Sequence, residues 1–131
     1  MRFLYACVTG GLKGDGTIDF IGATFTTNVA VGQKVFLSAN KAMGSNAAGG
    51  AGGMRLYVCY RNTTGSSVVA VGAGSFDYSV PQNIRSSFGM SGVITGLAPG
   101  NYEFGMCAQG VSTPANWNNN EYGYVSGMLL N

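Results

Sequence analysis

Glycine recurs every few residues along the whole chain, and this spacing restricts the fold more than any other feature of the sequence. The 131 residues include 22 glycines, and a glycine inside a helix costs about 1 kcal/mol relative to alanine. Between the glycines, apolar residues alternate with a period close to two, and Val, Ile, Thr, Tyr and Phe gather in short runs bounded by Gly, Asn, Ser and Pro. Such runs are typical of β-strands. The sequence therefore predicts an all-β chain.

The number of these runs indicates the architecture. About eight short strands with turn residues between them are typical of a β-sandwich or a jelly roll. Because the length is that of one ordinary domain, we expect residues 1–131 to form a single-domain antiparallel β-sandwich. The stretch 44–53 contains only Gly, Ala, Ser and Asn and predicts a flexible loop. The predicted strands lie at 2–9, 17–26, 34–40, 54–61, 67–72, 86–96, 101–108 and 122–130.

Two turn motifs predict local connections. The dipeptide Asp15-Gly16 lies between apolar runs and is typical of a hairpin, since a type I′ turn needs positive φ at both central positions. The segment 98–101, Ala-Pro-Gly-Asn, fits a type II turn. This second turn predicts that 86–96 and 101–108 pair as an antiparallel hairpin.

Side-chain parity predicts which faces are buried. In 101–108, Tyr102, Phe104 and Met106 share one face, which we expect to point into the core. The two terminal strands differ, because both of their faces are apolar, and an antiparallel sheet in a monomer normally has one wet face.

A second subunit could cover the extra apolar face of the terminal strands. The low charge content favours such self-association, and we expect a homo-oligomer, with a trimer favoured. The alternative is that these strands lie in the middle of the monomer's own sandwich and are shielded by loops. The predicted interface residues are Phe3, Tyr5, Tyr122, Tyr124 and Met128.

The cysteines and the hydropathy pattern bear on the compartment. Cys7, Cys59 and Cys107 cannot all pair within one chain, so at least one thiol is free or joined between chains. The alternative to any bridge is three small buried hydrophobes in a reduced compartment. The apolar run at 2–9 is too short for a signal-peptide core, and no run approaches the roughly 18 residues that span a bilayer. We expect no signal peptide and no membrane insertion.

The composition excludes most common catalytic chemistry. With no histidine, the chain has no Ser-His-Asp or Cys-His system and no His-ligated zinc. A net charge of +2 with 9% charged residues does not provide the basic field that nucleic-acid binding needs. We therefore expect a protein that is not an enzyme, with no catalytic residues, no metal, no cofactor and no nucleic-acid partner.

The segment Gly92–Phe104, GVITGLAPGNYEF, carries a family resemblance. Together with the short strands, the Gly/Asn/Ser-rich turns and the apolar terminal strands, it resembles the jelly-roll modules of the TNF/C1q-like type, which occur on bacterial surface proteins and phage fibres. A similar Leu-x-Pro-Gly-x-x-Tyr phrase occurs in fibronectin type III and other immunoglobulin-like sandwiches. Here the tyrosine lies one residue nearer the glycine, so the jelly roll is favoured over the immunoglobulin-like fold.

One loop has the composition of a polar-ligand site. Residues 112–122 contain the only tryptophan, four asparagines, a carboxylate and a tyrosine; an aromatic face can stack on a sugar while amides bind its hydroxyls. The alternative is that the tryptophan plugs one end of the sandwich and the asparagines form turns. The predicted ligand-binding residues are Asn116, Trp117, Asn118, Asn119, Asn120, Glu121 and Tyr122.

Two functions follow from this fold and these residues. The first is a non-enzymatic recognition or adhesion module that binds a glycan or another surface receptor through its loops. The alternative is a structural subunit of a virion, fibre or cell-surface assembly with no small ligand. We expect association with a virion or a cell surface, and otherwise a cytoplasmic protein.

Overall fold

The strands of the protein follow the predicted segments closely. The computed structural model describes residues 2–8, 10–65 and 67–131. Each of the eight predicted strands overlaps a strand of the structure, although β5 continues to Val80, well beyond the predicted end at 72, and residue 9 of the first predicted strand lies outside the described residues. No helix among the described residues is long and apolar enough to cross a membrane. The elements are β1 (Arg2–Val8), β2 (Asp19–Val29), β3 (Lys34–Ser45), β4 (Ala51–Asn62), β5 (Val69–Val80), β6 (Ile84–Ile94), β7 (Gly100–Gly110), the 3₁₀ helix η1 (Pro114–Asn116) and β8 (Asn119–Leu130).

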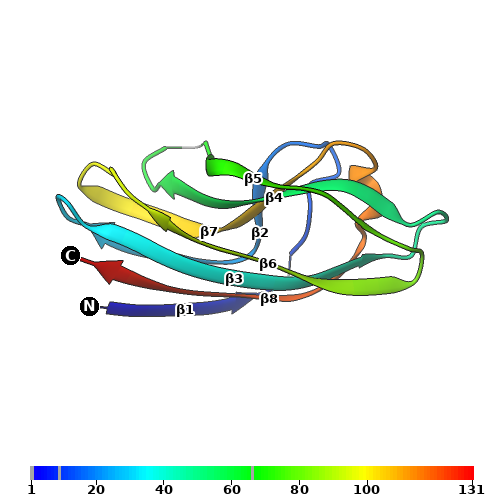
Figure 1. Cartoon of the computed structure of the whole chain (residues 1–131), viewed down its shortest axis with the longest axis horizontal. Helices are drawn as coiled ribbons and strands as arrows, with labels where there is room; N and C mark the ends of the chain where they lie inside the picture. Colours follow the sequence, from blue (N-terminus) through cyan, green and yellow to red (C-terminus); the bar gives the residue numbers. More distant parts are fainter. Residues whose placement is uncertain (1, 9, 66) are drawn as a thin grey trace.

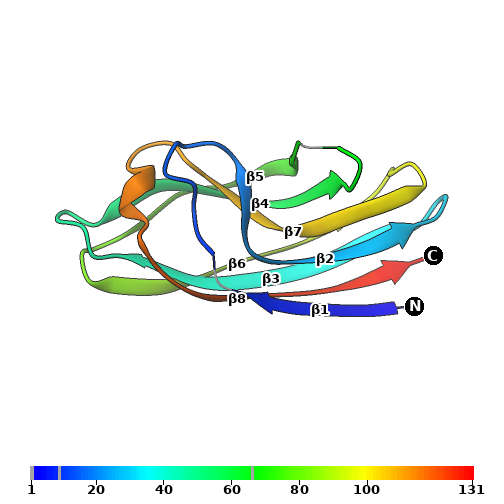
Figure 2. The same ribbon diagram turned by 180° about the vertical axis from the view of Figure 1, so that it is seen from behind.

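The strands form two antiparallel sheets that face each other, as Figure 1 and Figure 2 show from opposite sides. The first sheet has the order β1-β8-β3-β6 and the second β2-β7-β4-β5. Strand 1 thus pairs with 8, 2 with 7, 3 with 6 and 4 with 5, which matches the order of a jelly roll. The all-β sandwich is confirmed, and the strand order favours a jelly roll over an immunoglobulin-like arrangement.

Both predicted hairpins are wrong, and neither predicted turn type forms, because Asp15 lacks the positive φ of a type I′ turn and Gly100 lacks that of a type II turn. Gly16 closes a turn by donating its N–H to the Lys13 carbonyl at 3.3 Å, yet β1 and β2 lie in different sheets. Likewise β6 pairs with β3, whereas β7 pairs with β2 and β4. The Tyr102 hydroxyl donates to the Ala98 carbonyl at 2.9 Å and ties down the connection between these two sheets. Each turn therefore moves the chain from one sheet to the other.

The predicted loop at 44–53 is shorter than expected. Strand β3 continues through Ser45, and β4 begins at Ala51. Gly44 remains paired with Arg85 of β6, and a Cβ at this position would collide with the backbone carbonyl of Ile84. Small residues are typical of flexible loops, but they also allow strands to pack closely. The composition of this segment therefore predicted a longer loop than the structure has.

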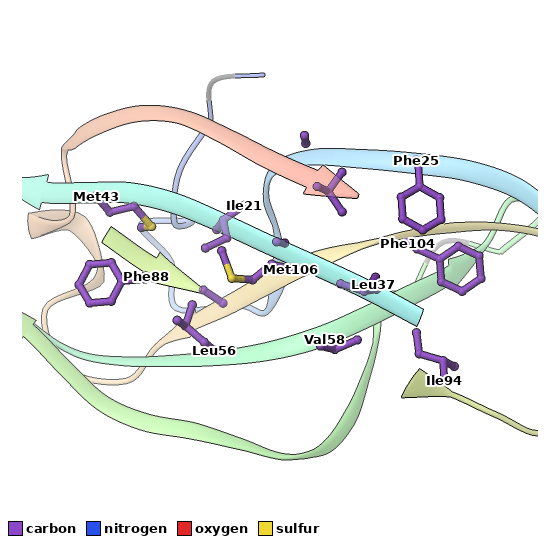
Figure 3. Close-up of a cluster of buried hydrophobic side chains, with 14 of the residues drawn as sticks. Ile21, Phe25, Leu37, Met43, Leu56, Val58, Phe88, Ile94, Phe104 and Met106 are labelled. Carbon is purple, nitrogen blue, oxygen red and sulfur yellow. The ribbon is translucent and has the colours of Figure 1, made fainter. Parts of the chain in front are cut away.

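The core lies between the two sheets and contains the residues that parity predicted. Tyr102, Phe104 and Met106 are all buried on the inner face of β7. Figure 3 shows Phe104 beside Phe25 of β2, with a ring-centroid distance of 5.4 Å. Because β-strands alternate faces, burial of this set fixes the opposite set on the outside of the sandwich.

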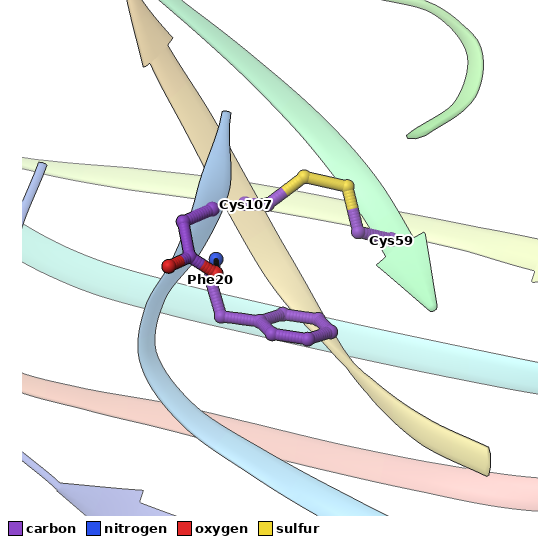
Figure 4. Close-up of a disulfide and its surroundings, with 4 residues drawn as sticks. Phe20, Cys59 and Cys107 are labelled. Carbon is purple, nitrogen blue, oxygen red and sulfur yellow. Dashed lines mark hydrogen bonds between the residues drawn. A yellow bond between two sulfur atoms is a disulfide. The ribbon is translucent and has the colours of Figure 1, made fainter. Parts of the chain in front are cut away.

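Two of the three cysteines form a disulfide on the outer face of the second sheet. Cys59 of β4 and Cys107 of β7 are bonded, with their Cα atoms 5.8 Å apart, and both are buried. Phe20 of β2 lies beside the bridge, as Figure 4 shows. Cys7 is exposed, so the interpretation of three buried thiols is wrong. Strand alternation puts Cys59 and Cys107 on the outer face of β4 and of β7, and the pairing of these two strands brings the cysteines together.

A buried lysine lies between the sheets where β2 approaches β8. Lys41 of β3 is 0% exposed, and its Nζ donates to the Glu121 carbonyl. A Cβ added at Gly22 or Gly123 would lie 3.4 Å from its side chain, so these glycines leave room for it. No carboxylate among the described residues forms an ion pair with it. Loss of solvation lowers the pKa of Lys41.

We predict that Lys41→Met stabilises the protein. Lys41 is buried without an ion pair, and removal of a charge from water costs several kcal/mol, so an apolar residue of similar size should raise stability by about 1–4 kcal/mol, the range reached when buried ion pairs are replaced. Chemical denaturation measures the effect, and Lys34→Met, at an exposed position of the same strand, should change stability by less than about 0.5 kcal/mol.

The difference in unfolding free energy between Lys41→Met and the wild type should decrease as the pH rises toward 10.5. The folded state holds this proton less tightly than the unfolded chain, whose lysine pKa is 10.5, so raising the pH through the interval below that value stabilises the wild type. If Lys41→Met is less stable than the wild type at neutral pH, the contacts of the buried ammonium stabilise the fold by more than its desolvation destabilises it.

The disulfide should contribute measurably to stability. It closes a loop with a sequence separation of 48 residues, and loss of a bridge of this span costs about 2–4 kcal/mol. We expect this loss in urea denaturation of the double variant Cys59→Ala/Cys107→Ala, and no loss in Cys7→Ala. Thiol titration of the unreduced, denatured wild type should find one thiol per chain, and three would contradict the bridge.

Candidate functional site

The outer face of the first sheet carries an apolar row that crosses all four strands. Phe3 of β1 lies opposite Met128 of β8, which lies opposite Phe36 of β3, which lies opposite Val93 of β6. Adjacent side chains in such a row are close enough to contact one another. The row therefore forms a continuous apolar band on the outside of the sandwich.

The next two rows are polar but uncharged. One contains Tyr5, Ser126, Ser38 and Ser91, and the other contains Cys7, Tyr124, Asn40 and Gly89. We call these three rows the uncharged face. The charged groups on the outer face of this sheet lie toward its ends: Lys34 is opposite Leu130, and Arg85 forms an ion pair with Glu121. No charge interrupts the centre of the face.

Several aromatic side chains of the uncharged face are open to solvent. Phe3 is 73% exposed and Tyr5 67% exposed, although both are large enough to dominate a core or an interface. The rings of Tyr5 and Tyr124 lie 6.5 Å apart at the centroids. Partial desolvation, with the neighbouring Cys7, raises the pKa of Tyr5.

A shallow hollow of about 400 Å³ lies within this face. It forms because Ser126 projects little side chain between the larger side chains of the flanking strands, and the inner side of Gly127 is filled by Phe25. The hollow can receive an apolar side chain of a partner. Its lining consists of Phe3, Leu4, Tyr5, Phe36, Ser126, Gly127 and Met128.

The outer face of the second sheet is charged by contrast. Arg61 of β4 lies opposite Glu103 of β7 and forms an ion pair with it. Glu103 also accepts a hydrogen bond from the Thr24 hydroxyl at 2.7 Å. Lys13 pairs with Asp19 at 2.9 Å, and this contact raises the pKa of Lys13. These charges satisfy one another and keep this face compatible with water.

The tryptophan of the predicted ligand loop belongs to the core. Trp117 is 2% exposed and packs edge-on against Phe88, with the ring centroids 5.7 Å apart. Its indole N–H donates to the Gly52 carbonyl at 3.3 Å. This is the plug at one end of the sandwich, and the buried ring presents no face for a sugar to stack on.

The asparagines around Trp117 hold the loop to its neighbours. The Asn116 amide donates to the Gly50 carbonyl at 2.9 Å, and the Asn118 side-chain oxygen accepts the Asn46 N–H at 2.9 Å. The Asn120 amide donates to the Trp117 carbonyl at 3.4 Å, and its buried oxygen has no hydrogen-bond partner among the described residues. Ligand binding by this loop stays a prediction.

The remaining predicted ligand residues point to different places. Asn119 pairs with Gly44 of β3, and Glu121 binds Arg85. Tyr122 is exposed and follows them along β8. A polar hollow of about 580 Å³ lies between the loop after β3 and the loop after β7, and Asn116 is the one predicted residue that lines it.

Of the predicted interface residues, the structure gathers Phe3, Tyr5, Tyr124 and Met128 on the uncharged face. Sequence reasoning missed Phe36 and Val93, which complete the apolar row. Leu37 is buried, so strand alternation places its neighbour Phe36 on the outer face of the strand. Only the strand order reveals that it lies beside Met128. Among the described residues, no three side chains of the metal-binding types come together.

Comparison with solved structures finds proteins of similar fold. No protein-family model matches the chain, and no curated protein matches its sequence. A chain from the structure of infectious bursal disease virus, Gx strain, is similar with a TM-score of 0.54 at 11% sequence identity. The likeness covers 97% of this chain and 32% of that chain, so this protein spans about a third of its neighbour. At this identity the comparison shows a shared fold.

We predict that Trp117→Ala strongly destabilises the protein. Truncation of a buried aromatic side chain costs about 3–5 kcal/mol, and we expect that loss in denaturant titration. Tyr122→Ala, at an exposed position of the same segment, should be nearly neutral.

A glycan array tests the ligand prediction, with the wild type and Trp117→Ala both kept below their unfolding temperatures. Loss of binding in Trp117→Ala while its fold is retained would support recognition by this loop.

Proposed function

We propose that this chain is a structural subunit that builds an assembly from copies of itself, packing through the uncharged face. The observation that carries the proposal is the apolar row Phe3–Met128–Phe36–Val93, which crosses a full sheet without a charge. Large apolar patches on the surface of a protein mark interaction sites. The uncharged face has the composition of such a site.

The residue types support an interface between proteins. Aromatic residues and methionine are enriched in interface cores, and charged residues are depleted there. Phe3, Tyr5, Tyr124 and Met128 belong to the enriched types, and the charges on the outer face of the sheet lie at its ends. The outer face of the second sheet provides the comparison within the same molecule: it carries paired charges, whereas the uncharged face carries none.

The likeness to a chain of infectious bursal disease virus supports a virion as the setting. It indicates that the fold occurs in a virus, and a particle subunit needs broad contacts with its neighbours rather than a catalytic site. We infer that the protein is not an enzyme, has no cofactor and works as part of a virion or a related surface assembly. Among these settings, the virion is the one that the comparison favours.

Recognition of a glycan or receptor is the second candidate. The observation that favours it is the hollow between Gly50 and Asn116, which is lined by polar side chains and by the glycine-rich backbone of 49–52. Backbone N–H and carbonyl groups can bind sugar hydroxyls. The lining of this hollow includes neither the buried Trp117 nor any residue of the uncharged face.

Analytical ultracentrifugation tests the assembly. We expect the wild type to sediment as a multiple of 13.5 kDa at micromolar concentration. Phe36→Lys should shift the protein toward 13.5 kDa by placing a charge in the centre of the uncharged face, with its melting temperature nearly unchanged.

The matched control is Val31→Lys, which changes an apolar residue that is 80% exposed in the turn between β2 and β3. This variant should assemble like the wild type. A wild type that stays at 13.5 kDa at every concentration, or an equal effect of both variants, contradicts the proposal.

A further inference from the structure

Strand β1 presents a free backbone edge. It pairs only with β8, in an unbroken register from Arg2 opposite Leu129 to Val8 opposite Gly123. It ends the sheet order, and no described strand pairs with its other side. In both Figure 1 and Figure 2 it is the outermost strand of its sheet. Its outward N–H and carbonyl groups are therefore available to another strand.

The other three edges carry features that discourage pairing. The register of β5 with β4 shifts three times, and β5 contains residues with positive φ at Gly72, Gly74 and Asp77. Strand β2 has a register shift between Phe20 and Thr24. Strand β6 is regular, but it carries Arg85 and is rich in serine. Bulges and charges are the usual protection of free edges.

Strand β1 has none of this protection over most of its length. From Phe3 to Val8 it contains no charge, no proline, no glycine and no register shift. Its side chains that face outward, Phe3 and Tyr5, are the most exposed aromatics of the uncharged face. A straight, apolar free edge of this kind is a template for another strand.

We propose that β1 pairs antiparallel with β1 of a second copy, so that the two four-stranded sheets become one continuous sheet. This inference rests on the proposed function, because it takes the partner to be the same chain. The contact is self-complementary, as a two-fold axis requires. It covers the exposed side chains of β1 and satisfies its free backbone groups.

Charge and parity select the orientation and the register. Arg2 is the only charged residue of β1, so a parallel pair would place two guanidinium groups side by side, whereas an antiparallel pair separates them by about 20 Å over six residues. Outward side chains must face outward side chains, which excludes a slip of one residue. Of the permitted registers, the one with Tyr5 opposite Tyr5 of the partner subunit pairs all seven residues.

This register extends the uncharged face across the axis. Phe3 comes to lie opposite Cys7 of the partner subunit, and the two Tyr5 side chains meet next to the Tyr5–Tyr124 ring pairs of each copy. A two-fold contact needs an even number of subunits. It therefore replaces the trimer expected from the sequence with a dimer or a larger even-numbered assembly.

Engineered disulfides test the pairing. In the variant Tyr5→Cys/Cys7→Ser, the two Cα atoms on the axis should be about 4.5–5.5 Å apart, which is within reach of a disulfide. Oxidised glutathione should then convert most of the protein into a covalent dimer on non-reducing gels. The matched control is Tyr122→Cys/Cys7→Ser, whose cysteine is also exposed on β8 but lies away from the axis and should remain largely monomeric.

A second variant fixes the register. Phe3→Cys with Cys7 retained should also form covalent dimers, because residue 3 faces residue 7 of the partner. The two cysteines of one chain are about 13 Å apart along the strand and cannot bridge each other. Wild-type protein, in which Cys7 faces Phe3, should not become cross-linked under the same conditions.

The outcomes separate this inference from the proposed function. If the wild type assembles but neither position 3 nor position 5 cross-links above the position-122 control, the edge pairing is wrong and the assembly uses the uncharged face alone. An odd number of subunits in the wild type also overturns the pairing. If the wild type is monomeric at all concentrations and neither the position-3 nor the position-5 variant cross-links above the position-122 control, both proposals fail.

Discussion

The packing of the two sheets against each other determines where every other feature of the molecule lies. Phe104, Met106 and their neighbours are buried between the sheets, and strand alternation then forces the intervening residues outward. The glycine pair Gly22 and Gly123 brings β2 and β8 into close contact and leaves room for Lys41 between them. Hydrophobic burial thus fixes the composition of both outer faces, and these faces differ because their outward residues differ.

The contrast between the two outer faces supports a role in assembly. On the second sheet, Arg61 and Glu103 neutralise each other beside a buried disulfide, and the face tolerates water. On the first sheet, three rows contain no charge, and Phe3 and Tyr5 stand largely in solvent. Burying this apolar surface against another copy releases water that it otherwise orders. The free edge of β1 lies beside the same face, so face packing and strand pairing can act together.

Parts of this surface could be predicted from the sequence, and parts could not. The exposure of Phe3, Tyr5 and Tyr124 follows from terminal strands that are apolar on both sides, since only one side can enter the core. The positions of Phe36 and Val93 in the same row depend on which strands are neighbours, and local patterning does not contain this information. Trp117 shows the converse: a loop composition that is typical of a ligand site serves here to close the core, because its indole packs on Phe88.

The sequence alone determines where the strands lie and which of their faces are buried. Its lack of histidine also excludes catalysis that depends on histidine. The period of two and the glycine spacing act over a few residues, so they can be read directly from the chain. The tertiary structure determines which strands pair. The two hairpins predicted from the sequence are wrong for this reason, and the Cys59–Cys107 bridge, the buried Lys41 and the free edge of β1 depend on the same pairing. These features join residues far apart in the sequence, because every connection between consecutive strands except that between β4 and β5 carries the chain across to the opposite sheet.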